Sequence, residues 1–471
     1  MQVSQALEAR FFKLVSSTFQ VVYSWRGRPD CIVCEFRANL APRLDVASML
    51  SLTLLLLAPT GLIFSKRLLG DFFSPPAIYT FFWAFSLGVL ELGWVSYDPL
   101  RERVWVVIIA SYASFMGGCL IVALYGFIRP AWLNAEPYLA HLDRHKLERA
   151  LLVLFAIGII GYLIQLVNIN TQIGFGTYLD DPSRAREVHS NVKYLGFFNI
   201  LNVANFVLAI SYLVLYRKPQ RWVYLVLFWA VASTLLTTDR TRFFYLVIWA
   251  FYVVVFLYRR VDLSPRLILA GAMTLLVLLL FFLTVARVYK KEALDDNMEY
   301  VNIPPQYGAM VDPYIYLTGS FPVLQAFLED KQELAYGKYS LGPLVKLVEL
   351  VYPEFQRVSL VGKFYRVPIE LNACTYLELF YKDFGFLGIV IGPLFLGVLC
   401  MGAYLIMRGR KTLFSVFFVS LLSFCITISI FVNHFSQIAT WYFVGVGYIV
   451  HRYCFSVEPK PQDDLRKHIF G

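Results

Sequence analysis

Long apolar runs constrain this chain more than any other feature. About eleven of them can cross the roughly 30 Å hydrocarbon core of a bilayer, which takes a helix of roughly 20 residues. They lie near 46–65, 76–96, 104–127, 149–169, 195–216, 222–238, 243–258, 267–286, 386–407, 414–432 and 436–451. Apolar residues make up 58% of the chain and charged residues 16%, whereas a soluble domain is about half apolar and about a quarter charged. The runs lack the alternation of membrane strands, so we expect an all-α, polytopic membrane protein with about 11 transmembrane helices, within a range of 10–12.

Basic residues in the short loops predict the orientation, because loops rich in Lys and Arg tend to stay cytoplasmic. One assignment puts fifteen of them inside and leaves seven in the opposite short loops. The inner set is Lys66, Arg67, Arg129, Arg144, Lys146, Arg149, Arg217, Lys218, Arg221, Arg259, Arg260, Arg266, Arg408, Arg410 and Lys411. We therefore expect membrane helices within 49–286 and 386–451, a large outward loop over 287–385 and a cytoplasmic tail over 452–471. The net charge of +10 then reflects inner loops that meet anionic lipid, and not nucleic-acid binding.

Signatures of common catalytic chemistry are absent from the sequence. It has no Gly-rich phosphate loop, dinucleotide fingerprint, HExxH motif or GxSxG elbow, which argues against ATP-driven transport. Cys31 and Cys34 form one CxxC, but a zinc site needs a second ligand pair at a suitable spacing and none follows nearby. We therefore expect neither a metal nor a cofactor.

The outward loop contains one amphipathic stretch. Residues 342–352 place apolar side chains at helical spacing, with Lys346 and Glu349 between them. This pattern suits a helix that lies at the membrane interface. A helix that packs on the bundle is the alternative.

Arginines gather at the outward boundary of the membrane. Asp239, Arg240 and Arg242 join two apolar runs with almost no loop, and Arg287 directly follows the run 267–286. Charges held near membrane depth are costly and tend to mark a ligand or a partner. The guanidinium group suits bidentate recognition of phosphate, so an outward-facing pyrophosphate lipid is the natural anion. Snorkelling to the lipid headgroups, or pairing with Asp239, is the alternative reading.

Three stretches carry a resemblance to a known family. They read Thr-Thr-Asp-Arg-Thr-Arg-Phe-Phe at 237–244, Tyr-Ile-Tyr-Leu-Thr-Gly-Ser-Phe at 314–321, and Asn-Ala-Cys-Thr-Tyr-Leu-Glu-Leu-Phe-Tyr-Lys-Asp-Phe-Gly-Phe-Leu-Gly at 372–388. The chain resembles the O-antigen polymerases, also called oligosaccharide repeat unit polymerases or Wzy proteins. The third stretch is the most specific, because in such polymerases this pattern leads from a large periplasmic loop into the next membrane helix. The resemblance spans roughly residues 49–451.

This resemblance implies a fold, a location and an activity. The fold would be a C-type glycosyltransferase-like bundle in the bacterial inner membrane, with its active site facing the periplasm. Such proteins join undecaprenyl-pyrophosphate-linked oligosaccharide units into O-antigen or a similar surface polysaccharide, without a nucleotide sugar or an obligatory metal. The implied partners are these lipid-linked oligosaccharides, membrane lipid, a chain-length regulator and a flippase. An O-antigen ligase-like transferase, and a lipid-linked oligosaccharide flippase or carrier, are the alternatives.

The reaction suggests which residues act. A pyrophosphate leaving group needs positive charge where negative charge develops, and we expect Arg287 and Arg240 to supply it, with Arg242 third. A base for the attacking hydroxyl is expected from His434, in the turn between the last two runs, or from Asp383. The residues expected to bind substrate are Arg242, Asp239, Tyr316, Asn372, Tyr376 and Glu378.

Structural roles compete with several of these assignments. His434 fits a turn residue that caps backbone groups, and Asp383 fits an ordinary helix cap. Glu378 lies four residues before Lys382 and fits a helix-surface ion pair.

The composition of residues 1–48 indicates that translation starts after Met1. They carry several arginines although the topology places them outside, and the run 11–23 is broken by Lys13 and too short for a signal peptide. We expect translation to begin at Met49, with 1–48 an upstream extension or a loosely ordered interfacial piece. Mass spectrometry of the native amino-terminal peptide checks this, and peptides covering Arg28 to Arg43 would contradict it.

Overall fold

The computed structural model describes residues 46–128, 139, 142–180, 198–216, 219–236, 240–257, 298–302, 308, 310–352, 358 and 362–455. Within these ranges the chain is mostly helical, and its one sheet is a two-stranded ribbon of β1 (Tyr365–Arg366) antiparallel to β2 (Glu370–Leu371). In this described part of the chain, five helices are long and apolar enough to cross a membrane. They are Met49–Leu69, Glu102–Gly126, Arg144–Ile173, Phe198–Leu215 and Phe386–Gly409. The prediction of a helical membrane protein is confirmed at this level.

Helices coincide with every predicted apolar run except 267–286, which lies outside the described residues. They are α3 (Val46–Leu69), α4 (Pro75–Leu90), α5 (Glu102–Ile128), α6 (Arg144–Ile173), α9 (Leu201–Leu215), α10 (Trp222–Leu236), α11 (Arg240–Phe244), the π-helix η6 (Tyr245–Trp249), α12 (Ala250–Leu257), α19 (Phe386–Gly409), α20 (Leu413–Ile428) and α21 (Ile438–Cys454). Shorter elements are α7 (Phe175–Asp180), η7 (Met298–Tyr300), α15 (Val311–Thr318), α16 (Ser320–Glu329), α17 (Gly342–Val351), α18 (Leu377–Phe384) and the 3₁₀ turn η9 (His434–Ser436). Lipid requires every backbone group to be paired within its own segment, which explains why the apolar runs become helices.

The chain divides into two compact units that do not follow the order of the sequence. Unit 1 takes the described residues of Met1–Tyr125, Asp296–Gly402 and Ile426–Gln437. Unit 2 takes those of Gly126–Asp295, Ala403–Cys425 and Ile438–Gly471. The described residues of the predicted loop 287–385 therefore cluster with helices from the amino-terminal part of the chain.

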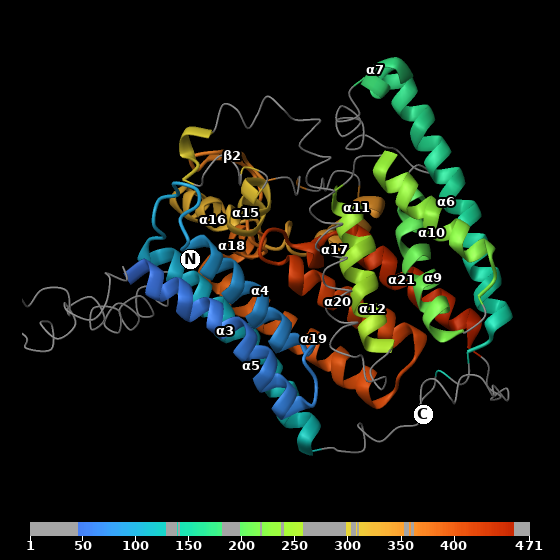
Figure 1. The fold of residues 1–471 in the computed structure, drawn as a ribbon, viewed down its shortest axis with the longest axis horizontal. Helices are drawn as coiled ribbons and strands as arrows, with labels where there is room; N and C mark the ends of the chain where they lie inside the picture. Colours follow the sequence, from blue (N-terminus) through green and yellow to red (C-terminus); the bar gives the residue numbers. More distant parts are fainter. Residues whose placement is uncertain are drawn as a thin grey trace, which may run out of the picture. The chain divides into compact units, whose positions relative to one another are not determined.

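In unit 1, α3 and α4 form an antiparallel helix pair, and α15 lies at the end of α4 (Figure 1). Ser51 Oγ donates to the Gly88 carbonyl oxygen at 2.7 Å, and Tyr314 OH donates to the Leu90 carbonyl oxygen at 3.0 Å. The outer face of α3 exposes large apolar side chains, such as Phe64 at 64%. Such a face needs lipid around it, as expected for a membrane helix.

The backbones of α5 and α19 touch where they cross. A Cβ atom at Gly118 would overlap the Leu394 carbonyl oxygen, and one at Gly397 would overlap the Phe115 carbonyl oxygen. Cys119 Sγ also contacts the Gly397 carbonyl oxygen at 3.6 Å. Small residues allow this close approach, which gives membrane helices van der Waals contact that larger side chains would prevent.

In unit 2, α9 is the central helix and packs against α6, α10 and α12 (Figure 1). Most of its side chains are buried, including Val207 and Leu208 at 0% exposure. Asp143 begins α6, because its side chain accepts hydrogen bonds from the backbone N–H groups of His145 and Lys146.

Contacts join segments that the predicted topology places on the same side. Among outward segments, Val95 bridges Val301 and Arg101 pairs with Glu329 at 2.8 Å. Segments predicted to lie inward make two contacts. Leu142 and Phe455 form an antiparallel β-bridge, and Lys411 Nζ donates to the Leu257 carbonyl oxygen at 3.2 Å. The alternation of segments is therefore consistent within each unit.

The amphipathic stretch 342–352 forms α17 as predicted. Lys346 and Glu349 form an ion pair at 3.0 Å. Its large apolar side chains are mostly exposed, with Leu347 at 61% and Val351 at 69%, whereas Val345 is buried. This face therefore does not pack on the described part of the chain, and its position at the membrane interface stays a prediction.

Substitutions at two neighbouring glycines test the contact between α5 and α19. Gly118→Ala should destabilise the protein by about 1–3 kcal/mol, the usual cost of overpacking, because the new methyl group would meet the α19 backbone. Gly117→Ala is the matched control, since its Cβ would lie 3.7 Å from Leu394 Cδ1, an ordinary contact. Thermal unfolding of both variants in detergent measures the difference, and equal stabilities would contradict the crossing.

Candidate functional site

The most specific stretch of the sequence, 372–388, forms α18 and a tight reversal into α19. Gly385 adopts a φ of 59°, which favours glycine, and its N–H donates to the Tyr381 carbonyl oxygen at 2.7 Å. A Cβ at Gly388 would overlap the Phe380 carbonyl oxygen. The two glycines of this Phe-Gly-Phe-Leu-Gly turn are therefore required by its geometry.

Tyr376 connects the stretch 372–388 to the turn between α20 and α21 through hydrogen bonds of its backbone. Its N–H donates to the Ser429 carbonyl oxygen at 2.9 Å, and its own carbonyl oxygen accepts from Asn433 Nδ2 at 3.3 Å. Tyr376 OH is also 3.0 Å from Tyr79 OH. Trp83 Nε1 donates to Ser429 Oγ at 3.0 Å. These groups form a buried polar centre in unit 1, which we call the Tyr376 centre.

Burial determines the protonation of two members of this stretch. Burial raises the pKa of the Tyr376 hydroxyl, and the nearby Tyr79 raises it further. Burial also raises the pKa of the Cys374 thiol well above its usual value, with the charge of Glu378 as the next cause. Both groups are therefore protonated at neutral pH, so Tyr376 can act as a hydrogen-bond donor and Cys374 is not a thiolate nucleophile.

His434 lies in the predicted turn, within η9, and its side chain is only 1% exposed. Asn433 caps the turn, because its Oδ1 accepts from the Ser436 N–H at 3.2 Å. The hydroxyl of Ser436 is buried and has no hydrogen-bond partner among the described residues. Asn433 therefore caps this turn, and the buried Ser436 hydroxyl lies two residues after His434 in the chain. The catalytic role of His434 stays a prediction.

Asp383 is completely buried at the end of α18. Its carboxylate accepts backbone N–H groups of Tyr339, at 3.1 and 3.2 Å, and of Ser340, at 2.5 Å. Its carbonyl oxygen accepts the N–H of Tyr336, which has a φ of 52° and an exposed side chain. A non-glycine residue with such a φ is uncommon. Asp383 thus has a structural role as the anchor of the segment 335–341, and its catalytic role stays a prediction.

Glu378 pairs with Lys382 at 2.6 Å, as the helix-surface reading predicts, but both side chains are mostly buried. The Lys382 ammonium also lies 5.5 Å from the ring centre of Phe327 and 5.1 Å from that of Tyr339. These cation–π contacts and the ion pair together compensate for burial of the charge. Substrate binding by Glu378 stays a prediction.

Two further predicted residues, Tyr316 in α15 and Asn372 before α18, are half-buried in unit 1. Asn372 belongs to the same stretch as Tyr376, whereas Tyr316 lies in a different segment of unit 1, residues 310–352. Their contact with a sugar stays a prediction.

Of the predicted arginines, Arg240 and Arg242 are described, and they belong to unit 2. Helix α11 begins at Arg240, and Arg242 is half-buried in its first turn. Asp239 and Arg287 lie outside the described residues. The helix then becomes a π-helix over Tyr245–Trp249, a rare distortion that is frequent at functional sites. Tyr245 OH lies 3.0 Å from Thr440 Oγ1, which fixes this distorted turn.

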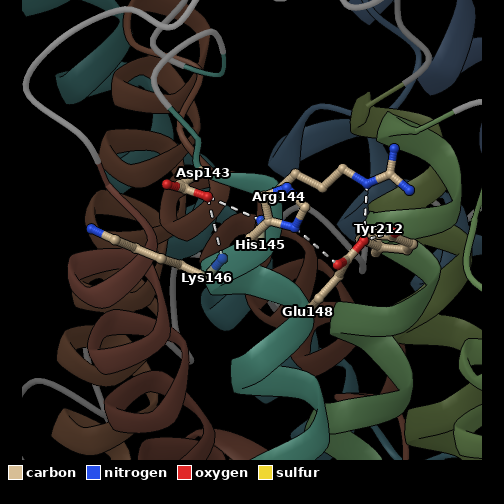
Figure 2. Close-up of polar contacts among 6 residues, drawn as sticks. All are labelled: Asp143, Arg144, His145, Lys146, Glu148 and Tyr212. Atoms are coloured by element: carbon tan, nitrogen blue, oxygen red, sulfur yellow. Dashed lines mark hydrogen bonds and ion pairs between the residues drawn. The ribbon is translucent and has the colours of Figure 1, made fainter.

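A second polar cluster, missed by sequence reasoning, lies at the start of α6 (Figure 2). Glu148 accepts from Arg144 Nε at 2.9 Å and from Tyr212 OH at 2.5 Å, and its other oxygen is 3.4 Å from His145 Nδ1. The Arg144 guanidinium also lies 5.3 Å from the ring centre of Tyr216. The spacing of Arg144 and Glu148 could have indicated their pair, but nothing in the sequence indicates Tyr212, which is 64 residues away.

Comparison with known proteins identifies no relative. No family model matches the chain, and neither the curated proteins nor the solved structures contain a match. Any function must therefore be argued from the residues themselves.

The segment 335–341 provides a test of the Asp383 anchor. Asp383→Ala should speed amide hydrogen exchange at Tyr339 and Ser340, because each buried donor left unpaired costs about 1–3 kcal/mol. Asp330→Ala is the control, since this partly exposed carboxylate pairs with Lys363 at 3.0 Å instead. Exchange measured by mass spectrometry decides the matter, and unchanged protection in Asp383→Ala would refute the anchor.

Proposed function

We propose that this protein is a membrane glycosyltransferase that polymerises undecaprenyl-pyrophosphate-linked oligosaccharide repeat units. The observation that supports this most directly is the Tyr376 centre. The stretch that most specifically resembles the O-antigen polymerases is held by two hydrogen bonds to the turn that contains His434. The most specific motif therefore contacts the turn that contains the candidate base His434.

In the proposed reaction, a hydroxyl oxygen of the acceptor sugar attacks the anomeric carbon of the donor. The bond from that carbon to the pyrophosphate oxygen breaks, and undecaprenyl pyrophosphate leaves with the electron pair. The proton of the attacking hydroxyl passes to His434. Arg287, Arg240 and Arg242 are the residues that the sequence predicts to stabilise the charge on the leaving group, because guanidinium groups pair well with phosphate oxygens.

The location of the site supports the same proposal. The basic inner loops favour an orientation with 287–385 outside, about eleven membrane helices and, in a bacterium, a periplasmic active site. The buried hydroxyl of Ser436 suits a sugar, since a bound hydroxyl would satisfy it. Asn372, Tyr376, Tyr316 and Glu378 are the further candidates for sugar contact.

Complementation of a strain that lacks the gene tests the proposal. Wild-type protein should restore a ladder of surface glycan on silver-stained gels, whereas Arg287→Ala and His434→Ala should leave a single-unit band. Arg287 supplies leaving-group charge, and loss of one such group typically costs about 10²–10³ in rate. Arg149→Ala is the control, because this exposed residue lies in the predicted inner set.

Immunoblots must show equal amounts of each variant in the membrane. An unchanged ladder in the deletion strain would contradict the polymerase. Loss of all units from the lipopolysaccharide, rather than all but one, would identify a ligase instead.

A further inference from the structure

A row of side-chain amides follows the contact between α6 and α9 in unit 2. Asn199 Nδ2 donates to Gln165 Oε1 at 2.5 Å, and Asn202 Nδ2 donates to Asn199 Oδ1 at 2.7 Å and to the Gly158 carbonyl oxygen at 3.2 Å. Asn205 follows one turn further along α9. Each of these four amides is at most 2% exposed. We call this set the amide row.

Glycines on α6 make room for the amide row. A Cβ at Gly158 would overlap Asn202 Oδ1, and one at Gly161 would lie 2.5 Å from the Asn199 backbone nitrogen. The polar side chains therefore pack directly on the α6 backbone. This fit indicates that the row belongs to the helix contact itself.

The hydrogen bonds of the row stop before Asn205, the member nearest the carboxyl end of α9. Both polar atoms of the Asn205 side chain, and Asn202 Oδ1, have no partner among the described residues. Asn205 is only 1% exposed and lies on a helix apolar enough to span the membrane. An unpaired buried amide is strongly disfavoured, and in lipid no bulk water relieves it.

We propose that Asn205 binds an ordered water molecule inside unit 2. The ligand must both donate and accept, because the amide offers one carbonyl oxygen and one NH₂ group. It must also be neutral, since the row contains no charged side chain, and small, since these residues are almost completely enclosed. Water meets all three conditions, and buried waters typically satisfy such groups.

This site would extend a polar seam toward the cluster of Figure 2. Asn205 and Tyr212 lie two turns apart on nearly the same face of α9, about 10 Å along its axis. Tyr212 in turn donates to Glu148. A water bound to Asn205 would therefore extend the line of hydrogen-bonding groups along the contact between α6 and α9, from Gln165 toward Glu148.

X-ray radiolytic footprinting of the full-length protein in detergent tests the proposal, because radicals generated from bound water oxidise the side chains beside it. Leu201 and Leu208 flank Asn205 on α9 and are themselves buried. They should be oxidised in the wild-type protein, and Asn205→Leu should reduce this oxidation at least fivefold. Ser211→Ala is the control, because the Ser211 hydroxyl is equally buried but bonds within its own helix, to the Val207 carbonyl oxygen at 2.9 Å.

A second measurement covers the case in which Asn205→Leu does not fold. A cryo-electron microscopy map of the wild-type protein should show density within hydrogen-bonding distance of the Asn205 amide. Oxidation unaffected by a folded Asn205→Leu, or a map in which buried waters appear elsewhere but a protein group pairs with Asn205, would overturn the proposal.

Discussion

Hydrogen bonds to the backbone of the turn 429–437 join three segments of unit 1. This turn interrupts the helical path between α20 and α21, and its residues are largely buried. Non-helical chain at such a place is tolerated only if protein groups pair its polar atoms. The carbonyl oxygens of Ser429 and Ile430 accept from the Tyr376 N–H and from Ser320 Oγ. Three separate segments thus meet because one turn needs their donors.

Charged and neutral polar groups occupy different places, as desolvation requires. The buried carboxylates of Glu378 and Asp383 lie on the short helix α18, and Glu148 lies near the start of α6; each has charged or backbone partners. The amides of Asn199, Asn202 and Asn205 instead lie within a long apolar helix. Neutral groups cost less to bury than charges. Arg240 and Arg242, for which we propose contacts with pyrophosphate, likewise lie in the short helix α11 and not within a long apolar helix.

The sequence predicts the helices well, because lipid makes hydropathy almost sufficient to locate them. Bounds differ where helices extend beyond the hydrocarbon: the run 149–169 becomes α6 from Arg144 to Ile173, since Asp143 caps it earlier.

The polar contacts were less predictable. Asp383 can be picked out in the sequence, but its partners cannot. The N–H groups of Tyr339 and Ser340 reach its carboxylate only because the chain folds back on itself. The same holds for Glu148 and Tyr212. Pairing at a distance leaves no local pattern, whereas the Glu378–Lys382 pair does.

The contact of α5 with α19 limits how unit 1 can move. With Gly118 on Leu394 and Gly397 on Phe115, the two helices share a point at which neither can slide past the other without a steric clash. Since α18 joins α19 through Gly385, this point also restrains the Tyr376 centre. Rocking about the crossing is compatible with it, and translation of either helix is not. Any movement that opens the Tyr376 centre must therefore come from the segments around these two helices, with the crossing as a fixed point.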